Sequence, residues 1–559
     1  MKIAMLQINA CLAQPEKNSR VIEAAYLEAI RLGAALVVTP ELAVPGYIPD
    51  DKLFEPNLRR AIEKENYRLQ AITGSVPLVF GTCSPTGSGK LWSELWWCEH
   101  GKLRIKTRKA FLADFDSYDE SRYFESAKSQ QNVLDYLNKK IGLLIGENLH
   151  DSFENLIQAG VTLIVNVTAS TCALGSYVPE GRNPSWALPS KSKQRCEFLS
   201  RQAKTYAAPI LYINRVGADG NLLFDGDSCL TLPDGTQQCG ETFNTGIFIV
   251  DTDEQGAVRI DESDDEGVWL HKALSMGIKD NLTKQSIEGV IIGLSGGVDS
   301  AVVAALAAGA ICPKKILGVA LPTRFTSKKS VELARQQAQL LGINYLELDA
   351  DVIFASAASS LLSALPNRQF GLTDENLQSR SRGMLLLALT SEPAIHSQLG
   401  TNRCAVLNTG NKSEVAVGYF TLYGDAIGAF GVIGDLVKKR VYTLAHVSGD
   451  SIPEQVINRS PTAELRPAQT DESSLIPYRQ LDAIVGALIE ANRPIECVYD
   501  DLAEVLDGQD LLQARNALPR IQKLIIKSEF KRRQLPFALK VTHRGFGSGM
   551  RIPLTGIYS

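Results

Sequence analysis

An apolar run that ends in a turn of glycines and serines constrains this chain more than any other feature. Val290-Ile-Ile292 precedes Gly293 and Leu294, and Ser295-Gly-Gly-Val-Asp-Ser300 then leads into the small-residue stretch 301–310. This order predicts a buried strand, a tight turn and a helix. The glycines let the backbone approach a ligand closely, and the first amides of the helix favour an anion. The segment therefore predicts an α/β domain that binds a phosphate group at the end of a strand.

The side chains of the turn narrow the ligand further. Ser295 and Ser300 supply hydroxyl donors, and Asp299 supplies a carboxylate that can hold Mg²⁺ against phosphate. The turn resembles the pyrophosphate loop, SGGxDS, of the ATP pyrophosphatase family. That resemblance implies an enzyme that splits ATP between its α- and β-phosphates and passes AMP to an acceptor.

Composition excludes several classes of protein. A length of 559 residues predicts more than one domain, and a net charge of −4 favours neither nucleic acid nor an anionic membrane as a partner. We find no membrane-length apolar run and no secretory signal in Met1-Lys-Ile-Ala4, which is typical of a strand. The ten cysteines lack CxxC spacing and no HExxH occurs, so we expect reduced thiols, a cytoplasmic location and no zinc site.

Short apolar runs and helical patterns alternate in the first half of the chain. They predict an α/β sandwich or layered sheet over residues 1–255. The expected helices are Asn18–Arg31 and Ser192–Ala207. The expected strands are Ile3–Ile8, Ala35–Val38, Leu78–Phe80, Ile141–Ile145, Leu163–Val167, Ile210–Ile213 and Ile247–Val250.

An acidic, polar run at residues 256–270 is the best candidate for a linker. Strand–helix units follow it and predict a doubly wound parallel sheet over residues 271–559, with the phosphate turn at the carboxyl end of its first strand. The expected strands are Val290–Ile292, Ile316–Ala320, Tyr345–Leu348 and Ala405–Asn408.

Later segments of the second half choose among enzymes that use such a turn. These segments, in chain order, are Glu375–Gly383, Leu407–Glu414, Tyr419–Asp425, Pro461–Glu472, Ser528–Gln534, Phe546-Gly547 and Arg551–Pro553. Together they resemble the synthetase domain of NAD⁺ synthetases over residues 271–559. The resemblance implies that ATP activates the nicotinate carboxylate of deamido-NAD⁺ as an adenylate, which ammonia attacks to give NAD⁺, AMP and pyrophosphate. It also implies a homo-oligomer, at least a dimer.

The resemblance assigns roles to individual residues. It implies that ATP is bound by Gly293, Leu294, Ser295, Gly296, Gly297, Val298, Asp299, Ser300 and Thr409. It implies that deamido-NAD⁺ is bound by Asn376, Arg382, Lys412, Glu414 and Lys531, and that Asp299 and Glu414 hold Mg²⁺. Three pairs depart from the family pattern: Gly434-Asp435 replaces Lys-Asp, Lys438-Lys439 replaces Lys-Thr, and Phe537-Ala538 replaces Pro-Gly. These departures concern fine substrate contacts rather than the class of reaction.

The first half carries a second set of motifs. Thr39-Pro-Glu41 places a carboxylate just after a strand, Lys106–Leu112 places cations before an apolar residue, and Asp119–Phe124 follows. This order resembles the nitrilase, or carbon–nitrogen hydrolase, superfamily over residues 1–255. In glutamine-dependent NAD⁺ synthetases such a domain hydrolyses glutamine with a Glu-Lys-Cys triad and sends the ammonia through a tunnel. Glu41 and Lys109 match the first two members of the triad.

The nucleophile of that triad is missing. The chain reads Ile145-Gly146-Glu-Asn148 where the resemblance predicts Ile-Cys-Glu-Asp, and glycine cannot form a thioester. Three further positions depart: Phe115 replaces a tyrosine, Ala113 replaces a proline, and the substrate-binding lysine falls near Ser176. We therefore expect a pseudo-glutaminase domain and a synthetase that uses ammonia. Two alternatives stay open: a related ligase that amidates a different carboxylate, and a glutaminase that uses a displaced nucleophile such as Cys172.

Overall fold

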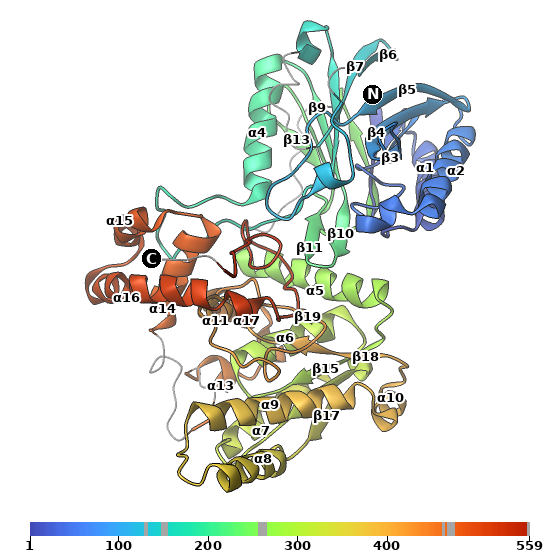
Figure 1. Ribbon diagram of the computed structural model, residues 1–559. Coiled ribbons are helices and arrows are strands. Elements are labelled where there is room, and N and C mark those ends of the chain that lie inside the picture. Colours follow the sequence, from blue (N-terminus) through green and yellow to red (C-terminus); the bar gives the residue numbers. More distant parts are fainter. Residues whose placement is uncertain (128–131, 147–154, 255–264, 461–463, 467–475, 556–559) are drawn as a thin grey trace. The chain divides into compact units, whose positions relative to one another are not determined.

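The structure is a computed structural model that describes residues 1–127, 132–146, 155–254, 265–460, 464–466 and 476–555 (Figure 1). It divides into two compact units. Unit 1 comprises residues 1–172 and 191–264, and unit 2 comprises residues 173–190 and 265–559. Within the described residues, no helix is both long enough and apolar enough to span a bilayer.

Unit 1 is a sandwich of two six-stranded sheets. The strand orders are β14-β1-β2-β3-β4-β5 and β13-β12-β9-β8-β7-β6, and a separate hairpin joins β10 to β11. Strand β1 (Lys2–Gln7) shows why the sheets stack. Its Ile3 and Met5 pack between the sheets, while Ala4 and Leu6 pack on the opposite face in the cluster that includes Ile22 of α1. A strand that is buried on both faces reads as a continuous apolar run, and this explains why the sequence predicts it so clearly.

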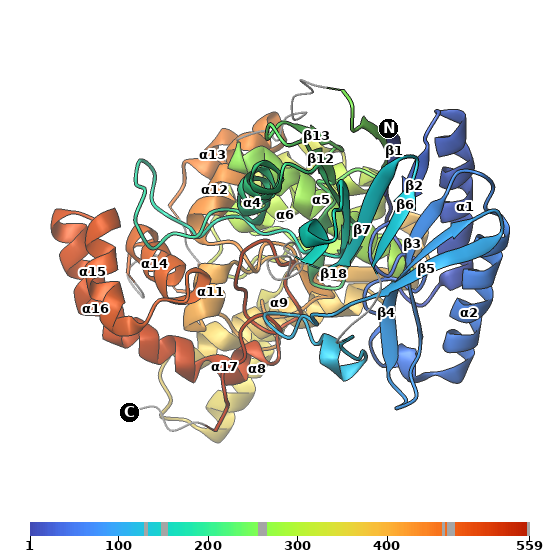
Figure 2. The ribbon, with the colours of Figure 1, turned by 90° about the horizontal axis from the view of Figure 1, so that it is seen from above.

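Helices cover the outer faces of unit 1. Figure 2 shows α1 and α2 side by side along the sheet that holds β3 and β4, and α4 lies against the other sheet, where it contacts β12. The strands of the first sheet are β1, β2 (Leu36–Val38), β3 (Leu78–Pro85), β4 (Leu91–Glu99), β5 (Lys102–Arg108) and β14 (Gly246–Asp251). Those of the second are β6 (Val133–Tyr136), β7 (Lys139–Ile145), β8 (Leu163–Thr168), β9 (Ile210–Asn214), β12 (Cys229–Thr231) and β13 (Gln237–Cys239). The remaining elements are β10 (Val216–Asp219), β11 (Leu222–Asp225), α1 (Pro15–Arg31), α2 (Pro56–Ala71), α4 (Lys191–Tyr206), η1 (Asp50–Phe54) and η2 (Glu120–Arg122).

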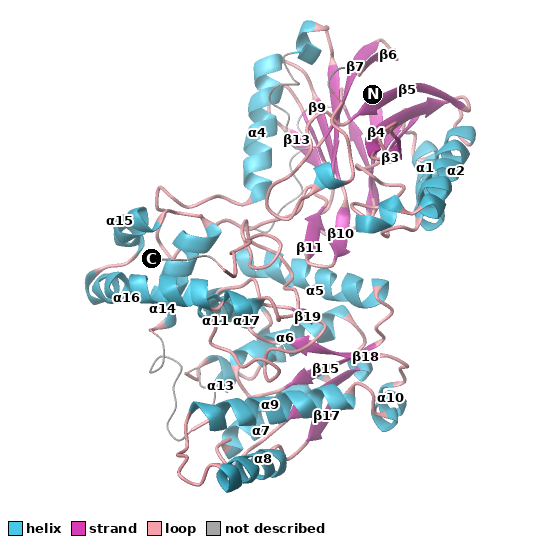
Figure 3. Ribbon diagram, in the orientation of Figure 1, coloured by secondary structure: helices cyan, strands magenta, loops and turns pink. Residues whose placement is uncertain are grey.

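Unit 2 is built on a five-stranded parallel sheet with the order β17-β16-β15-β18-β19. The strand order reverses between β15 and β18, and the carboxyl ends of strands at such a switch point form a crevice in doubly wound folds. Figure 3 shows that helices make up most of the rest of this unit. Helix α6 runs from the phosphate turn through a nearly continuous buried stretch, so its small alanines allow close packing against neighbouring elements.

The elements of unit 2 follow in chain order. The strands are β15 (Gly289–Gly293), β16 (Ile316–Ala320), β17 (Asn344–Glu347), β18 (Cys404–Asn408) and β19 (Phe430–Gly431). The first helices are α5 (Glu266–Lys284), α6 (Val298–Ala310), η3 (Pro313–Lys315), α7 (Lys328–Leu341), α8 (Asp351–Ala364), α9 (Leu372–Leu389), α10 (Pro393–Leu399), α11 (Lys412–Val417) and α12 (Lys438–Val447). The last are η4 (Gly449–Ser451), α13 (Glu454–Ile457), α14 (Tyr478–Val485), η6 (Gly486–Glu490), α15 (Ile495–Val505), α16 (Gly508–Lys527) and α17 (Glu529–Arg532).

A segment from the first half of the sequence belongs to unit 2. We call residues 173–190 the crossing segment, because the chain on both sides of it belongs to unit 1. Tyr177 and Trp186 are buried in the apolar cluster of α14, α15 and α16, and the indole N–H of Trp186 donates to the carbonyl of Asp501 at 3.2 Å. The crossing segment therefore supplies part of the core of unit 2.

The boundaries differ from the predicted ones at two places. The predicted first domain, 1–255, included the crossing segment, whose contacts place it in the other unit. The predicted linker, 256–270, overlaps α5, which begins at Glu266 after Asp265 accepts hydrogen bonds from the N–H groups of Gly267 and Val268. An acidic N-cap and a polar first turn cannot be distinguished from a polar linker in the sequence, so the predicted linker extended into the helix. Residues 256–264 of the predicted linker lie outside the described residues.

Candidate active sites

A cavity of about 440 Å³ opens at the carboxyl ends of the strands of unit 2. Its walls include Gly293 at the end of β15, the run Val319–Leu321 after β16, and Val406–Asn408 at the end of β18. The residues of the predicted sites that line it are Gly293, Leu294, Ser295, Gly297, Val298, Asp299, Ser300, Asn376, Arg382, Thr409, Glu414 and Lys531. The structure therefore brings together residues that span more than 200 positions of the sequence.

The phosphate turn is held by its own hydrogen bonds. The backbone N–H of Ser295 donates to the hydroxyl of Ser300 at 3.2 Å, and the two hydroxyls are 3.1 Å apart. Gly296 has a φ of +75°, and a Cβ atom there would lie 2.4 Å from the carbonyl oxygen of Ser330. Only glycine fits this close approach, and Gly297 then caps helix α6. The turn presents the first amides of α6 to the cavity, which is the arrangement that favours an anion.

A lysine that the sequence analysis did not assign to the site lies between the two predicted metal ligands. The ammonium of Lys438 donates to the carboxylate of Asp299 and lies 3.5 Å from a carboxylate oxygen of Glu414. Burial alone would lower the pKa of Lys438, but the two carboxylates outweigh burial and raise it. Because both carboxylates reach one cation, they are close enough to serve a second one. Hard carboxylate oxygens are the ligands that Mg²⁺ prefers, so this donor set fits that ion.

Three cavity residues predicted to bind substrate are fixed by neighbouring groups. Arg382 donates to the carbonyl of Leu321 at 3.0 Å, and burial lowers its pKa. The side-chain oxygen of Asn376 accepts from the hydroxyl of Thr421 at 2.8 Å. Lys531 donates to the carbonyls of Gly418 and Phe420, both at 2.9 Å, and burial lowers its pKa as well.

Lys412 takes a different place from the one that the sequence predicts. Its side chain is fully buried, and its ammonium lies 2.9 Å from the carboxylates of both Asp435 and Glu490. It also donates to the hydroxyl of Thr542 at 2.8 Å. Lys412 does not belong to the described lining of the cavity, and its charge is balanced by Asp435 and Glu490. That Lys412 contacts deamido-NAD⁺ stays a prediction.

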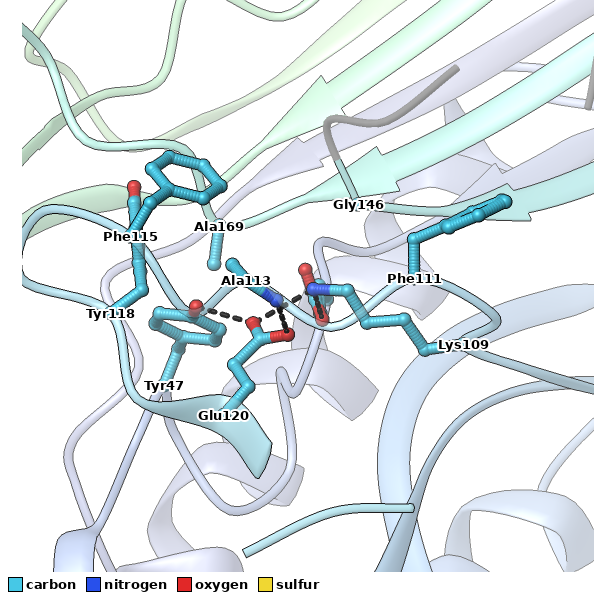
Figure 4. A pocket seen from close by; sticks show the side chains of 10 residues that line it. Tyr47, Lys109, Phe111, Ala113, Phe115, Tyr118, Glu120, Gly146 and Ala169 are labelled. Atoms are coloured by element: carbon cyan, nitrogen blue, oxygen red, sulfur yellow. Dashed lines mark hydrogen bonds and ion pairs between the residues drawn. The ribbon is translucent and has the colours of Figure 1, made fainter. Parts of the chain in front are cut away.

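A second, much smaller cavity of about 20 Å³ lies in unit 1 (Figure 4). Glu41 and Lys109, the two predicted members of the triad, line it together with Glu120. The ammonium of Lys109 lies 2.8 Å from a carboxylate oxygen of each glutamate. The hydroxyl of Tyr47 donates to Glu120 at 2.5 Å, and the N–H of Ala113 donates to the other oxygen of Glu120 at 2.8 Å. The sequence did not single out Glu120, although it lies in the quoted segment Asp119–Phe124.

The charge balance of this small site is set by burial. Burial raises the pKa of Glu41 to about 7, although Lys109 opposes the shift. Burial alone would lower the pKa of Lys109, but Glu41 and Glu120 outweigh it and raise that pKa. A carboxylate that titrates near neutral pH is suited to act as a general base. The positions of Glu41 and Lys109 are compatible with the base and the cation predicted for this site.

The predicted nucleophile position also lines this cavity. Gly146 has a φ of +97°, a conformation that side chains rarely adopt. In Figure 4 the side chain of Lys109 runs past Gly146 toward the carboxylate of Glu120. The neighbouring residues Glu147 and Asn148 of the same motif lie outside the described residues.

The other residues of the first half that depart from the nitrilase pattern do not all lie at this cavity. Phe115 and Ala113 line the cavity, as their sequence positions suggest. Ser176 belongs to the crossing segment of unit 2, so it does not mark the lysine of this site. Lys191 does lie nearby: its ammonium donates to the hydroxyl of Thr171 at 3.1 Å and lies 5.7 Å from the ring centre of Tyr118, which lines the cavity. Cys172 is buried, its N–H donates to the carbonyl of Leu223, and it does not belong to the described lining.

Comparison with known families assigns each half of the chain to a class. A sequence model of the carbon–nitrogen hydrolase family matches residues 2–260, and one of the NAD synthase family matches residues 270–535. The sandwich of unit 1 and the parallel sheet with its phosphate turn in unit 2 agree with these two classes. The chain is therefore a two-domain enzyme of the NAD synthase class.

Full-length relatives make the assignment narrower. The chain is 34% identical over 587 aligned residues to the glutamine-dependent NAD(+) synthetase of Synechocystis sp., with 99% of this chain and 98% of the relative covered. It is 32% identical to that of Acinetobacter baylyi, with 99% and 98% covered. The chain belongs to the family of glutamine-dependent NAD(+) synthetases. A solved structure of such an enzyme from Acinetobacter baumannii in complex with ADP is 30% identical, with 99% of this chain and 98% of that chain covered and a TM-score of 0.72. The enzyme from Cytophaga hutchinsonii, 18% identical with a TM-score of 0.80, covers 100% of this chain and 98% of its own length and shares the fold.

Proposed function

We propose that this protein is an NAD⁺ synthetase that amidates deamido-NAD⁺ with free ammonia instead of glutamine. The observation that carries the proposal is the contrast between the two cavities. Most of the residues predicted to bind ATP, metal and substrate line the larger one, whereas the smaller one is lined by Gly146 at the predicted position of the nucleophile. Without a thiolate no thioester with the glutamine side chain can form.

The proposed chemistry has two steps. The nicotinate carboxylate attacks the α-phosphorus of ATP, and pyrophosphate leaves with the electron pair of the broken P–O bond. Ammonia then attacks the acyl carbon, AMP leaves, and a proton is released to give the amide. The turn at Ser295–Ser300 binds phosphate oxygens through its amides and hydroxyls, and Lys438 and Arg382 lower the repulsion between the two anionic substrates.

A divalent cation has a defined place in this proposal. Asp299 and Glu414 would hold Mg²⁺, which supplies charge neutralisation for the phosphates when bound. Lys438, which now contacts both carboxylates, would keep them oriented toward the cavity.

Two of the departures in unit 2, Gly434 and Ala538, are compatible with deamido-NAD⁺ as the acceptor. A Cβ atom at Gly434 would lie 2.8 Å from the Cβ of Ala538, so the glycine at one position fits the alanine at the other. Neither residue belongs to the described lining of the cavity. The two residues therefore compensate each other in packing, and neither change alters the described lining of the cavity.

The test is a side-by-side assay with ammonium and with glutamine as nitrogen donor. We expect ATP-dependent formation of NAD⁺ and AMP in equal amounts with ammonium, and neither product above background with glutamine. Nicotinate mononucleotide in place of deamido-NAD⁺ tests the alternative acceptor. Glutamate release by the wild-type protein would contradict the pseudo-glutaminase part, and a Cys172→Ser variant would then show whether that thiol is the source.

We also infer that the protein self-associates through unit 2. Met384 and Leu387 are 52% and 46% exposed, and their spacing places them on one face of α9. The neighbouring helix α8, which packs on α9, exposes Val352 and Leu362. Apolar side chains that gather on packed helices support an interface with a second copy of the chain.

A further inference from the structure

Arg459 lines the large cavity but has no role in the reaction described so far. It follows the short helix α13, and one guanidinium nitrogen donates to the hydroxyl of Ser330 at 2.6 Å. A second nitrogen donates to the carboxylate of Glu464. The remaining N–H groups of Arg459 donate to no protein atom in the part of the chain that the structure describes.

Arg459 is attached to the wall against which the phosphate turn packs. Ser330 is the third residue of helix α7, and its carbonyl oxygen is the atom that would lie 2.4 Å from a Cβ at Gly296. Its hydroxyl accepts from Arg459 and donates to Glu464 at 3.0 Å. A single residue therefore separates the guanidinium from the glycine at the centre of the turn.

The turn itself lacks a cation, so the charge of a bound triphosphate must be balanced by other residues. Four cationic side chains line the described cavity: Arg382, Lys438, Arg459 and Lys531. Lys438 is held by Asp299 and Glu414, while Arg382 and Lys531 donate to backbone carbonyls. Arg459 is the one whose main protein partner is a carboxylate outside the predicted metal site. A guanidinium binds phosphate oxygens with the same paired N–H geometry that it uses for a carboxylate.

We propose that Arg459 binds the β- and γ-phosphates of ATP and the pyrophosphate product, and that Glu464 competes with them for the guanidinium. This inference rests on the proposed function, because it assumes that ATP binds in the large cavity. It assigns the side of the cavity near Ser330 to the leaving group and the side near β18 to the AMP half of the nucleotide. When pyrophosphate leaves, Glu464 would take its place on the guanidinium. Pyrophosphate would therefore dissociate more easily than from an arginine without a competing carboxylate.

The experiment compares two ligands that separate the two halves of ATP. Pyrophosphate and AMP are titrated calorimetrically, each with Mg²⁺, onto the full-length wild-type protein and the Arg459→Ala and Glu464→Gln variants. Loss of a charge-assisted contact should weaken pyrophosphate binding to Arg459→Ala by about tenfold or more and leave AMP binding within about twofold. Glu464→Gln, which keeps the side-chain shape, should bind pyrophosphate more tightly than wild type.

Arg335→Ala is the matched control. Arg335 lies on the same helix as Ser330 and pairs with a carboxylate, Glu347, but it lies outside the described lining of the cavity. It should leave both affinities unchanged. Pyrophosphate affinity that is unchanged in Arg459→Ala, or AMP affinity that falls by the same factor, would overturn the inference, as would weaker pyrophosphate binding by Glu464→Gln. Failure of wild type to bind either ligand would instead count against the proposed function.

Discussion

Gly146 and Lys109 compete for one small space: a Cβ atom built on Gly146 would lie 2.7 Å from the Cε of Lys109 and 3.1 Å from its ammonium nitrogen. The lysine cannot retreat without giving up its ion pairs with Glu41 and Glu120. A side chain at position 146 would therefore displace Lys109 from its present place.

Gly146→Cys should consequently fail to restore a glutaminase. The positive φ and the contact with Lys109 should together destabilise the protein by about 1–3 kcal/mol. We expect glutamate release at background level and a lower melting temperature of unit 1. Gly146→Ala, which has the same Cβ but no thiol, should show the same loss of stability. Glutamate release by the cysteine variant above that of the alanine variant would contradict this prediction.

Asp299→Asn should lower kcat/KM of the ammonium-dependent reaction by at least about a hundredfold, because it removes one of the two carboxylates available to Mg²⁺. Asparagine is preferable to alanine because Asp299 also pairs with the buried ammonium of Lys438 and accepts from the side chain of Asn411 at 3.0 Å. Raising the Mg²⁺ concentration should recover part of the rate. A variant within tenfold of wild type at limiting Mg²⁺ would remove Asp299 from the metal site.

Asp482 predicts a pH dependence of the stability of unit 2. The side chain is fully buried and accepts from the hydroxyl of Ser413 and, at 2.9 Å, from the N–H of Lys439. Burial raises its pKa to about 6, although the bond from Ser413 opposes the shift. The folded protein thus binds this proton more tightly than an unfolded chain, in which the pKa is about 3.9. The stabilisation is complete below about pH 4 and is lost as the pH rises through about 6, a change of about 3 kcal/mol.

The non-titrating variant Asp482→Asn provides the measurement. The free energy of unfolding of the variant minus that of wild type should rise by about 2 kcal/mol between pH 4.5 and 7.5, so the variant gains stability relative to wild type over this range. Thermal unfolding of the transition that ATP shifts reports on unit 2. A difference between the two proteins that does not change with pH would exclude Asp482 as the titrating group.

Truncating Trp186 should destabilise unit 2, even though the residue lies in the first half of the sequence. Removal of a buried indole leaves a cavity, and Trp186→Ala should cost about 3–5 kcal/mol. Leu188→Ala, in the same crossing segment but 38% exposed, should cost less than about 1 kcal/mol. The readout is again the ATP-shifted thermal transition. Equal effects of the two substitutions would contradict the packing described for the crossing segment.

Self-association should depend on the exposed face of α9. The wild-type protein should sediment as a dimer or larger species, and the double variant Met384→Glu/Leu387→Glu should sediment as a monomer, because two buried carboxylates would oppose the interface. Glu substitution of the exposed residue Leu27 in unit 1 serves as the control. A monomeric wild type would contradict the inference directly.

The sequence predicted strands most reliably where burial on both faces alone determines the residue types. Strand β1 and the strands around the phosphate turn are buried on both faces, so their apolar runs are unambiguous. Strand β5 was missed because four of its seven residues are charged: Lys102, Arg104, Lys106 and Arg108 alternate with apolar or small residues on a partly exposed strand. For a related reason, the sequence analysis included Lys412 among the predicted site residues and left out Lys438. A buried structural lysine such as Lys412 and a site lysine such as Lys438 look alike in sequence, and only their counter-ions distinguish them.

The departures from the family pattern were also clear only in three dimensions. Gly434 and Ala538 are more than 100 residues apart, and their compensation follows because a Cβ added at Gly434 would lie 2.8 Å from the Cβ of Ala538. Nothing in the composition of residues 173–190 marks them as part of another unit, because membership is decided by where Tyr177 and Trp186 are buried.

The crossing segment has a consequence for how such a chain can change over time. Tyr177 donates its N–H to Glu490 at 2.6 Å, the residue that also neutralises Lys412, and Gly175 accepts from Arg440 at 2.8 Å. A gene shortened to encode only residues 265–559 would lose these groups and expose the apolar surface that they cover. The synthetase half is therefore not a separable module. A deletion of the first half of the sequence would also remove part of the core of unit 2.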